Sequence, residues 1–106
     1  MKPDVVVVGD EVEAHVERLR DAGYDVSVSE GGTDALVDAG VDRADAVVVV
    51  GREHAVQVVV ARDVNPALRT VLVAEGAPDY VRGSVDVVLS SGVEDRVVDA
   101  VSTEEA

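Results

Sequence analysis

The chain contains five short apolar segments, and a glycine follows each of them within three residues. The segments are rich in valine, whose branched side chain favours pleated, buried strands, and they cover residues 5–8, 26–29, 46–50, 71–74 and 85–89. In an open α/β sheet, ligands bind outside the carboxyl ends of the strands, where glycine lets the backbone approach closely. The pattern therefore predicts five strands whose carboxyl ends form the edge of a nucleotide-binding fold.

Between these segments, apolar side chains recur three and four residues apart, which predicts a helix after each strand. Asp10 can cap the first helix, with Glu13 three residues later as its partner in a capping box. His15 falls on the apolar stripe of this helix, so we expect it to pack in the core. Further helical segments are predicted at 33–39, 53–64, 78–81 and 93–101, with a second capping box at Ser91 and Glu94 and a frayed tail at 102–106.

The alternation of strands and helices indicates one α/β domain that spans residues 1–106. Right-handed crossovers between parallel strands build a three-layer sandwich of the Rossmann-like or flavodoxin-like type. Residues 25–29 alternate between apolar and polar, as an edge strand does, whereas 46–50 are all apolar and belong in the centre. We therefore predict a five-stranded parallel sheet in the order 2-1-3-4-5. Its switch point lies between strands one and three, where 9–11 faces 51–54.

Composition narrows the classes of function. The apolar residues are valine, alanine and a few leucines, without phenylalanine or tryptophan, which favours a tightly packed sheet over a large ligand cavity. The absence of cysteine removes disulfides, thiol nucleophiles and thiolate metal ligands. No apolar run approaches the roughly 18 residues of a membrane span, and no signal-peptide pattern opens the chain. We expect a cytoplasmic protein with no membrane contact.

The formal net charge is −13, from 22 acidic and 9 basic residues. The acids are spread through the predicted helices and loops rather than clustered. This distribution favours adaptation to concentrated salt, where self-repulsion is screened, over recognition of a basic partner. Because no basic stripe is present to neutralise phosphates, nucleic acid is disfavoured as a direct ligand.

The predicted carboxyl edge of the sheet carries acids together with two cations. Its acids are Asp10, Glu11, Glu30, Glu53 and Glu75. Arg52 and His54 lie at the start of a predicted helix, where an anion such as a nucleotide phosphate could bind. Alternatively, Arg52 pairs with Glu53 or Asp10, and His54 caps the turn.

Other chemistry receives little support from the sequence. Asp10 and Glu11 could hold Mg²⁺ through carboxylate oxygens, but helix capping and the helix dipole explain them better. We therefore predict no metal site. No nucleophile or acid–base pair stands in a recognisable arrangement. We therefore predict no catalytic residues and no enzymatic activity.

Three phrases between Ala39 and Val101 resemble a known family. They are Ala39-Gly-Val-Asp-Arg-Ala-Asp-Ala-Val-Val-Val-Val50, Ala61-Arg-Asp-Val-Asn-Pro-Ala-Leu-Arg69, and Asp79-Tyr-Val followed by Val85-Asp-Val-Val-Leu-Ser90. Together they resemble the N-terminal nucleotide-binding domain of TrkA-type potassium-uptake regulators, also called RCK domains. Within that family the chain is similar to a short haloarchaeal form often labelled CTP synthetase. That activity is excluded here, because the chain lacks a phosphate-binding P-loop for ATP and a cysteine nucleophile for glutamine.

The TrkA resemblance implies a nucleotide site. Gly9 would be the remaining glycine of the family's Gly-x-Gly-x-x-Gly phosphate loop, and Glu30 would stand in the place of its ribose-binding acid. The loop glycines let backbone N–H groups reach pyrophosphate. Here Asp10 and Glu11 follow the first glycine and would repel that group. The altered loop predicts a binding or regulatory module.

The first 36 residues also resemble a response-regulator receiver. The sequence Val8-Gly9-Asp10-Glu11 is similar to the acidic pair after strand one, and 22–26 and 32–36 are similar to the next receiver segments. A receiver closes strand three with a phosphoacceptor aspartate, but Val50-Gly51 stands there. Ser90-Ser91 occupies the region of the late lysine. Phosphoryl transfer to this chain is therefore not predicted.

Three functions remain open, in order of preference. The first is a non-enzymatic regulatory or binding module derived from a TrkA-type domain, with no cofactor. The second is a nucleotide sensor, and the third is a pseudo-receiver signalling domain. We expect a homodimer through the apolar helix faces, and a protein partner such as a transporter or regulator. The nucleotide sensor would use Gly9, Asp10, Glu30, Gly51, Arg52 and His54.

Overall fold

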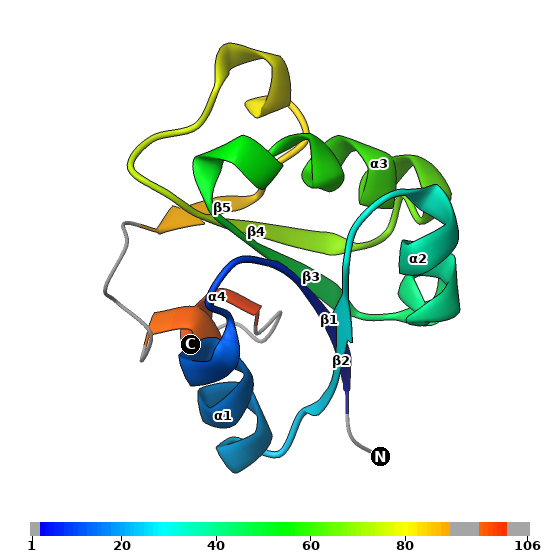
Figure 1. Cartoon of the computed structure of the whole chain (residues 1–106), viewed down its shortest axis with the longest axis vertical. Coiled ribbons are helices and arrows are strands. Elements are labelled where there is room, and N and C mark those ends of the chain that lie inside the picture. The colour runs from blue at the N-terminus through cyan, green and yellow to red at the C-terminus, as the bar shows by residue number, and fades with distance from the viewer. Residues whose placement is uncertain (1–2, 90–95, 102–106) are drawn as a thin grey trace.

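The computed structural model describes residues 3–89 and 96–101 and contains one parallel sheet of five strands (Figure 1). The strands are β1 (Asp4–Gly9), β2 (Asp25–Ser29), β3 (Ala46–Val50), β4 (Arg69–Val73) and β5 (Val87–Leu89). Their order is β2-β1-β3-β4-β5. The predicted fold class is confirmed, because this is the flavodoxin-like arrangement with its switch point between β1 and β3.

Helices cover both faces of the sheet (Figure 1). On one face lie α1 (Glu13–Asp21) and α4 (Val97–Val101), and on the other lie α2 (Thr33–Asp38) and α3 (Val56–Val64). Short 3-10 turns at η1 (Val41–Arg43), η2 (Arg52–His54) and η3 (Asp79–Val81) join these elements.

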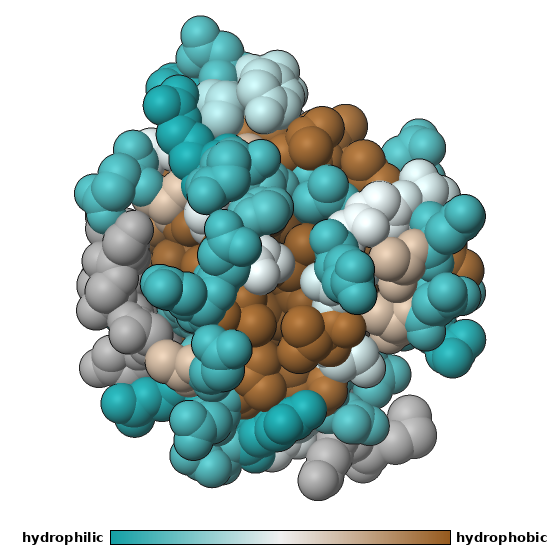
Figure 2. Space-filling model, in the orientation of Figure 1, coloured by the Kyte–Doolittle hydropathy of each residue, from teal (hydrophilic) through white to brown (hydrophobic). Residues whose placement is uncertain are grey.

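Two cores, one on each face, result from the alternation of side chains along the strands. In β1, Val5 and Val7 pack against α1 and α4, whereas Val6 and Val8 pack against the α2 and α3 side. A parallel sheet covered on both faces needs apolar residues at every position of its inner strands. This requirement explains the continuous valine runs. Figure 2 shows hydrophilic residues around most of the outline and apolar residues between them near the middle of the view.

The carboxyl end of β1 depends on Gly9, which pairs in register with Val50 of β3. Its φ is +134°, and a Cβ built on it would lie 2.1 Å from the backbone oxygen of Val50. Only glycine fits this close approach. The requirement comes from packing between two strands.

The predicted start of the first helix was wrong. We expected Asp10 to cap it, but α1 begins at Glu13 with Val12 at its N-cap and no side-chain cap. Glu11 has a φ of +51°, which delays the helix, and Asp10 turns toward His54 instead. Likewise, α3 begins at Val56 because the 3-10 turn η2 comes first. The second capping box at Ser91 and Glu94 and the tail 102–106 lie outside the described residues.

The amino ends of the strands are held by side chains between α3 and β4. The Asn65 amide donates to the backbone oxygens of Val41 and Ala44, at 3.1 and 3.2 Å. Arg69 donates from Nε to the backbone oxygen of Ala100, at 2.6 Å. These bonds tie the backbone oxygens of η1 and of the end of α4 to the chain that leads into β4, which supplies polar partners where the helical ladders end.

Arg62 and Asp86 form a second tie at the same end of the sheet. Arg62 donates from Nη1 to the backbone oxygen of Ser84 at 2.9 Å and lies 3.3 Å from Oδ2 of Asp86. That carboxylate oxygen also accepts the backbone N–H of Thr70, at 2.9 Å. Burial raises the pKa of Asp86, but the Thr70 hydrogen bond and the Arg62 charge outweigh it and hold the pKa below its ordinary value.

Candidate functional site

A cavity of about 850 Å³ opens at the carboxyl ends of β1, β3 and β4. Its size lies in the range of small-molecule sites, but carboxylates stand beside the apolar residues of its lining. Four acids and one cation, Arg52, line it; the acids are Asp10, Glu11, Glu53 and Glu75. His15 also reaches this cavity from α1 and is 5% exposed, so it packs in the interior as expected.

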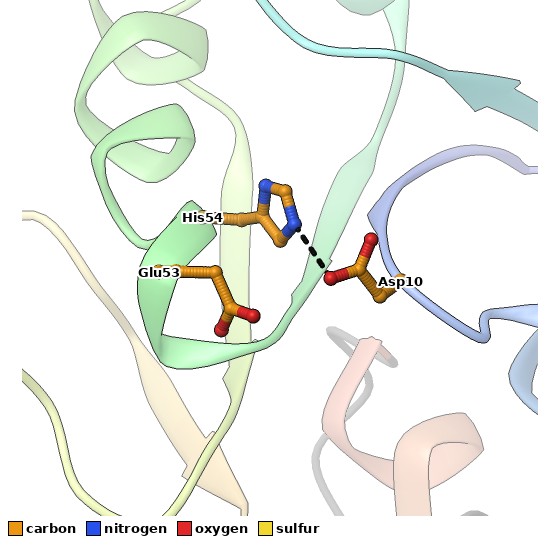
Figure 3. A group of neighbouring side chains, drawn as sticks. All are labelled: Asp10, Glu53 and His54. Atoms are coloured by element: carbon orange, nitrogen blue, oxygen red, sulfur yellow. Dashed lines mark ion pairs between the residues drawn. The ribbon is translucent and has the colours of Figure 1, made fainter.

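Three of the side chains at this edge converge (Figure 3). Nε2 of His54 lies 3.1 Å from Oδ2 of Asp10, close enough for an ion pair when the imidazole is protonated. Glu53, the neighbour of His54 on η2, brings a carboxylate oxygen to the same place. One ligand atom from each of the three residues lies within 4.8 Å of the others.

The electrostatics of the cavity favour cations. Each carboxylate at about 4 Å from a bound anion would cost about 1 kcal/mol in water and more in a partly enclosed site. Arg52 is the cation of the lining that would offset this repulsion of an anion. Among residues 3–89 and 96–101 it forms no ion pair with Glu53 or Asp10. The alternative in which Arg52 pairs with Glu53 or Asp10 is thereby corrected, because Asp10 lies beside His54 instead.

The structure brings together only part of the predicted nucleotide site. Asp10, Gly51 and Arg52 line the cavity, and His54 adjoins it through Asp10. Gly9 is not among the lining residues and belongs to the contact between β1 and β3.

Glu30 is not among the lining residues of this cavity. It is exposed and begins the turn after β2, where Gly32 donates its N–H to Oε1 of Gln57 at 2.7 Å. Gln57 and the place of Glu53 in the cluster were not anticipated. The place of Glu53 could have been inferred from the sequence, because Glu53 precedes His54 and the predicted strand order places Asp10 opposite both.

Gly51, at the end of β3, has a backbone that few other residues adopt. Its φ is +105° and its ψ is 132°. A Cβ at this position would lie 3.0 Å from Oε1 of Glu53 and 3.3 Å from Cδ2 of His54. At this position a side chain would therefore be disfavoured both by the positive φ and by contact with Glu53 and His54.

Solved structures with this arrangement are mainly response-regulator receivers. A response regulator from Thermotoga maritima is 17% identical with a TM-score of 0.73, and 95% of each chain is covered. The chemotaxis response regulator CheY4 of Vibrio cholerae is 16% identical with a TM-score of 0.72, covering 96% of this chain and 100% of its own. A protein described as pilus assembly-related, from Burkholderia pseudomallei, is 24% identical with a TM-score of 0.68, covering 92% and 85%.

These likenesses define the class by fold: a receiver-like α/β domain. The sequence itself matches the model described as "Family of unknown function (DUF7126)" over residues 5–104, and the chain belongs to that family. No curated protein matches the sequence significantly. Within the described residues, no helix combines the length and apolar character needed to cross a membrane.

The predicted membership of the TrkA or RCK family was wrong. The structural neighbours are CheY-like receivers, and the matching family is DUF7126. The phrase 61–69 carried much of the TrkA resemblance. Its Arg62, Asn65 and Arg69 hold the amino ends of the strands, at the opposite edge from the cavity. In this chain the phrase therefore serves packing at the amino ends of the strands and not the cavity, and the haloarchaeal TrkA assignment is wrong as well.

Proposed function

We propose that the chain is a pseudo-receiver: a non-enzymatic signalling module that keeps the receiver architecture and does not accept a phosphoryl group. The observation that carries the proposal is Val50-Gly51, the last residue of β3 and the one that follows it, where the resemblance places the phosphoacceptor aspartate. Neither valine nor glycine offers a carboxylate to attack a phosphoryl donor, so the central step of receiver signalling has no nucleophile at this position.

The conformation of Gly51 supports the same proposal. An aspartate there would have to adopt a φ near +105° and would press its Cβ toward Glu53. Such strain costs about 1–3 kcal/mol for a non-glycine residue. The turn after β3 is thus built around glycine, and one substitution would not restore an acceptor in working geometry.

The environment of the acidic pair supports the proposal as well. Asp10 is close to His54, and the carboxylates of Glu11, Glu53 and Glu75 surround the cavity. A phosphoryl group would meet these charges without an acceptor to hold it. Signalling would then depend on contacts of the folded domain with a protein partner or with a second copy of the chain.

Beryllofluoride tests this function, because it mimics a phosphoryl group on a receiver aspartate in the presence of Mg²⁺. We expect the backbone amide spectrum of this chain to show no new set of signals for Gly51, or for Ala74, which follows β4 and lines the cavity, when beryllofluoride is added to the Mg²⁺-containing sample. A receiver with its acceptor aspartate, treated in parallel, should show one. New, slowly exchanging signals around Gly51 would refute the pseudo-receiver proposal.

A further inference from the structure

We propose that Asp10, Glu53 and His54 form a binding site for one divalent transition-metal ion, with Zn²⁺ as its probe. Their ligand atoms lie within 4.8 Å of one another, although Asp10 follows β1 and the other two belong to η2 after β3. The fold, rather than local sequence, brings an imidazole and two carboxylates to one point at the switch between β1 and β3 (Figure 3).

The second observation is the state of the imidazole. The Nε2 atom of His54 is buried and makes no well-directed hydrogen bond among the described residues, although Oδ2 of Asp10 is only 3.1 Å away. A buried polar atom without a directed partner is costly. A cation at the centre of the three groups would accept the lone pair of the neutral ring and bind the two carboxylates at the same time.

The spacing suits coordination after small movements. Ligands bound to one tetrahedral ion at about 2.0–2.1 Å lie about 3.4 Å from one another. Asp10 and His54 already stand at that separation, at 3.1 Å. Glu53 is exposed, so its side chain can rotate toward them with little loss of packing. A fourth position would face the cavity and remain open to water or another ligand.

Charge and ligand type select the class of ion. Two carboxylates balance the charge of a divalent cation, and Glu11 and Glu75 add negative potential in the same cavity. One imidazole with carboxylates suits Zn²⁺ and its first-row neighbours, whereas Mg²⁺ prefers oxygen ligands and keeps much of its water. The inference concerns the donor set alone and does not depend on the pseudo-receiver function.

Calorimetric titration with Zn²⁺ at about pH 7.5 tests the site, in molar KCl to screen diffuse attraction by the acidic surface. We expect one saturable site per chain. His54→Ala, Asp10→Asn and Glu53→Gln should each weaken binding by about tenfold or more. Glu30→Gln is the matched control, because it removes an exposed carboxylate of the same sheet edge that lies outside the cavity lining and the cluster, and it should change the affinity little.

The ring signals of the two histidines provide an independent readout. Zn²⁺ should shift the His54 signal and leave His15 nearly unchanged, and a large excess of Mg²⁺ should not reverse the shift. Circular dichroism of each variant separates loss of a ligand from loss of the fold. Equal affinity in all folded variants, a primary shift at His15, or full displacement by Mg²⁺ would each overturn the metal-site proposal. None of these outcomes bears on whether beryllofluoride binds.

Discussion

Removing the charge of Asp86 should destabilise the fold by an amount that the structure allows us to bound. Oδ2 of Asp86 accepts the N–H of Thr70 at 2.9 Å and lies 3.3 Å from Nη1 of Arg62. In Asp86→Asn, the amide oxygen can still accept from Thr70, but the bond to Arg62 loses its charge assistance, which is worth about 1–2 kcal/mol. The side chains of Arg62 and Asp86 are 34% and 33% exposed, so solvent screens part of their attraction. We therefore expect Asp86→Asn to lower the free energy of unfolding by about 1 kcal/mol.

The effect should depend on pH with a definite sign. The folded pKa of Asp86 is lowered, so its stabilisation is fully present above the unfolded pKa of about 3.9 and is lost as pH falls through the lower folded pKa. Urea unfolding at neutral pH should therefore give a larger free energy of unfolding for the wild-type chain than for Asp86→Asn. The difference should shrink below about pH 4.

A control with the same distance but different burial is available in the chain. Arg82 and Asp79 also lie 3.3 Å apart, but their side chains are 70% and 98% exposed. Asp79→Asn should change the stability by less than about 0.5 kcal/mol. If Asp86→Asn behaves like this control at neutral pH, or if its deficit persists undiminished in acid, the proposed role of the Arg62 and Asp86 tie is refuted.

Three further predictions concern the carboxyl edge and the surface. In chemical denaturation, Gly9→Ala should lower the free energy of unfolding by more than about 3 kcal/mol, because the positive φ and a Cβ 2.1 Å from the Val50 oxygen both destabilise the folded state. A near-neutral effect would contradict the close strand contact. The melting temperature should rise strongly between low salt and molar KCl, because a net charge of −13 is then screened over about 3 Å; a flat profile would favour a basic partner instead. NAD at about 1 mM should give no thermal shift, since Asp10 and Glu11 lie in the cavity where its pyrophosphate would sit; a clear shift would revive the nucleotide sensor.

The fold could be predicted because its determinants are local and repeated. Valine runs at 46–50 and alternation at 25–29 distinguish a central strand from an edge strand, and the glycines mark the strand ends. The start of α1 could not be predicted, because it depends on a positive φ at Glu11, which no sequence pattern announces. The capping preference of Asp10 yielded to its approach to His54, a contact between segments far apart in the chain.

The candidate site was only partly visible in the sequence for a similar reason. Strand order placed 9–11 opposite 51–54, which brought Asp10 and His54 into one region. Glu30 follows β2, on the far side of β1, and the order of strands alone did not show that it lies outside the cavity lining. The phrase at 61–69 misled because Arg62, Asn65 and Arg69 bind backbone oxygens at the amino ends of the strands and take no part in the cavity.

Intact mass spectrometry after incubation with acetyl phosphate and Mg²⁺ tests the pseudo-receiver proposal most directly. With Gly51 at the end of β3, we predict that the chain keeps its unmodified mass while a phosphorylatable receiver in the same tube gains a phosphoryl group. A gain of one phosphoryl group by this chain, acid-stable enough to map to Asp10, Glu11 or Glu53, would contradict the proposal and identify a displaced acceptor.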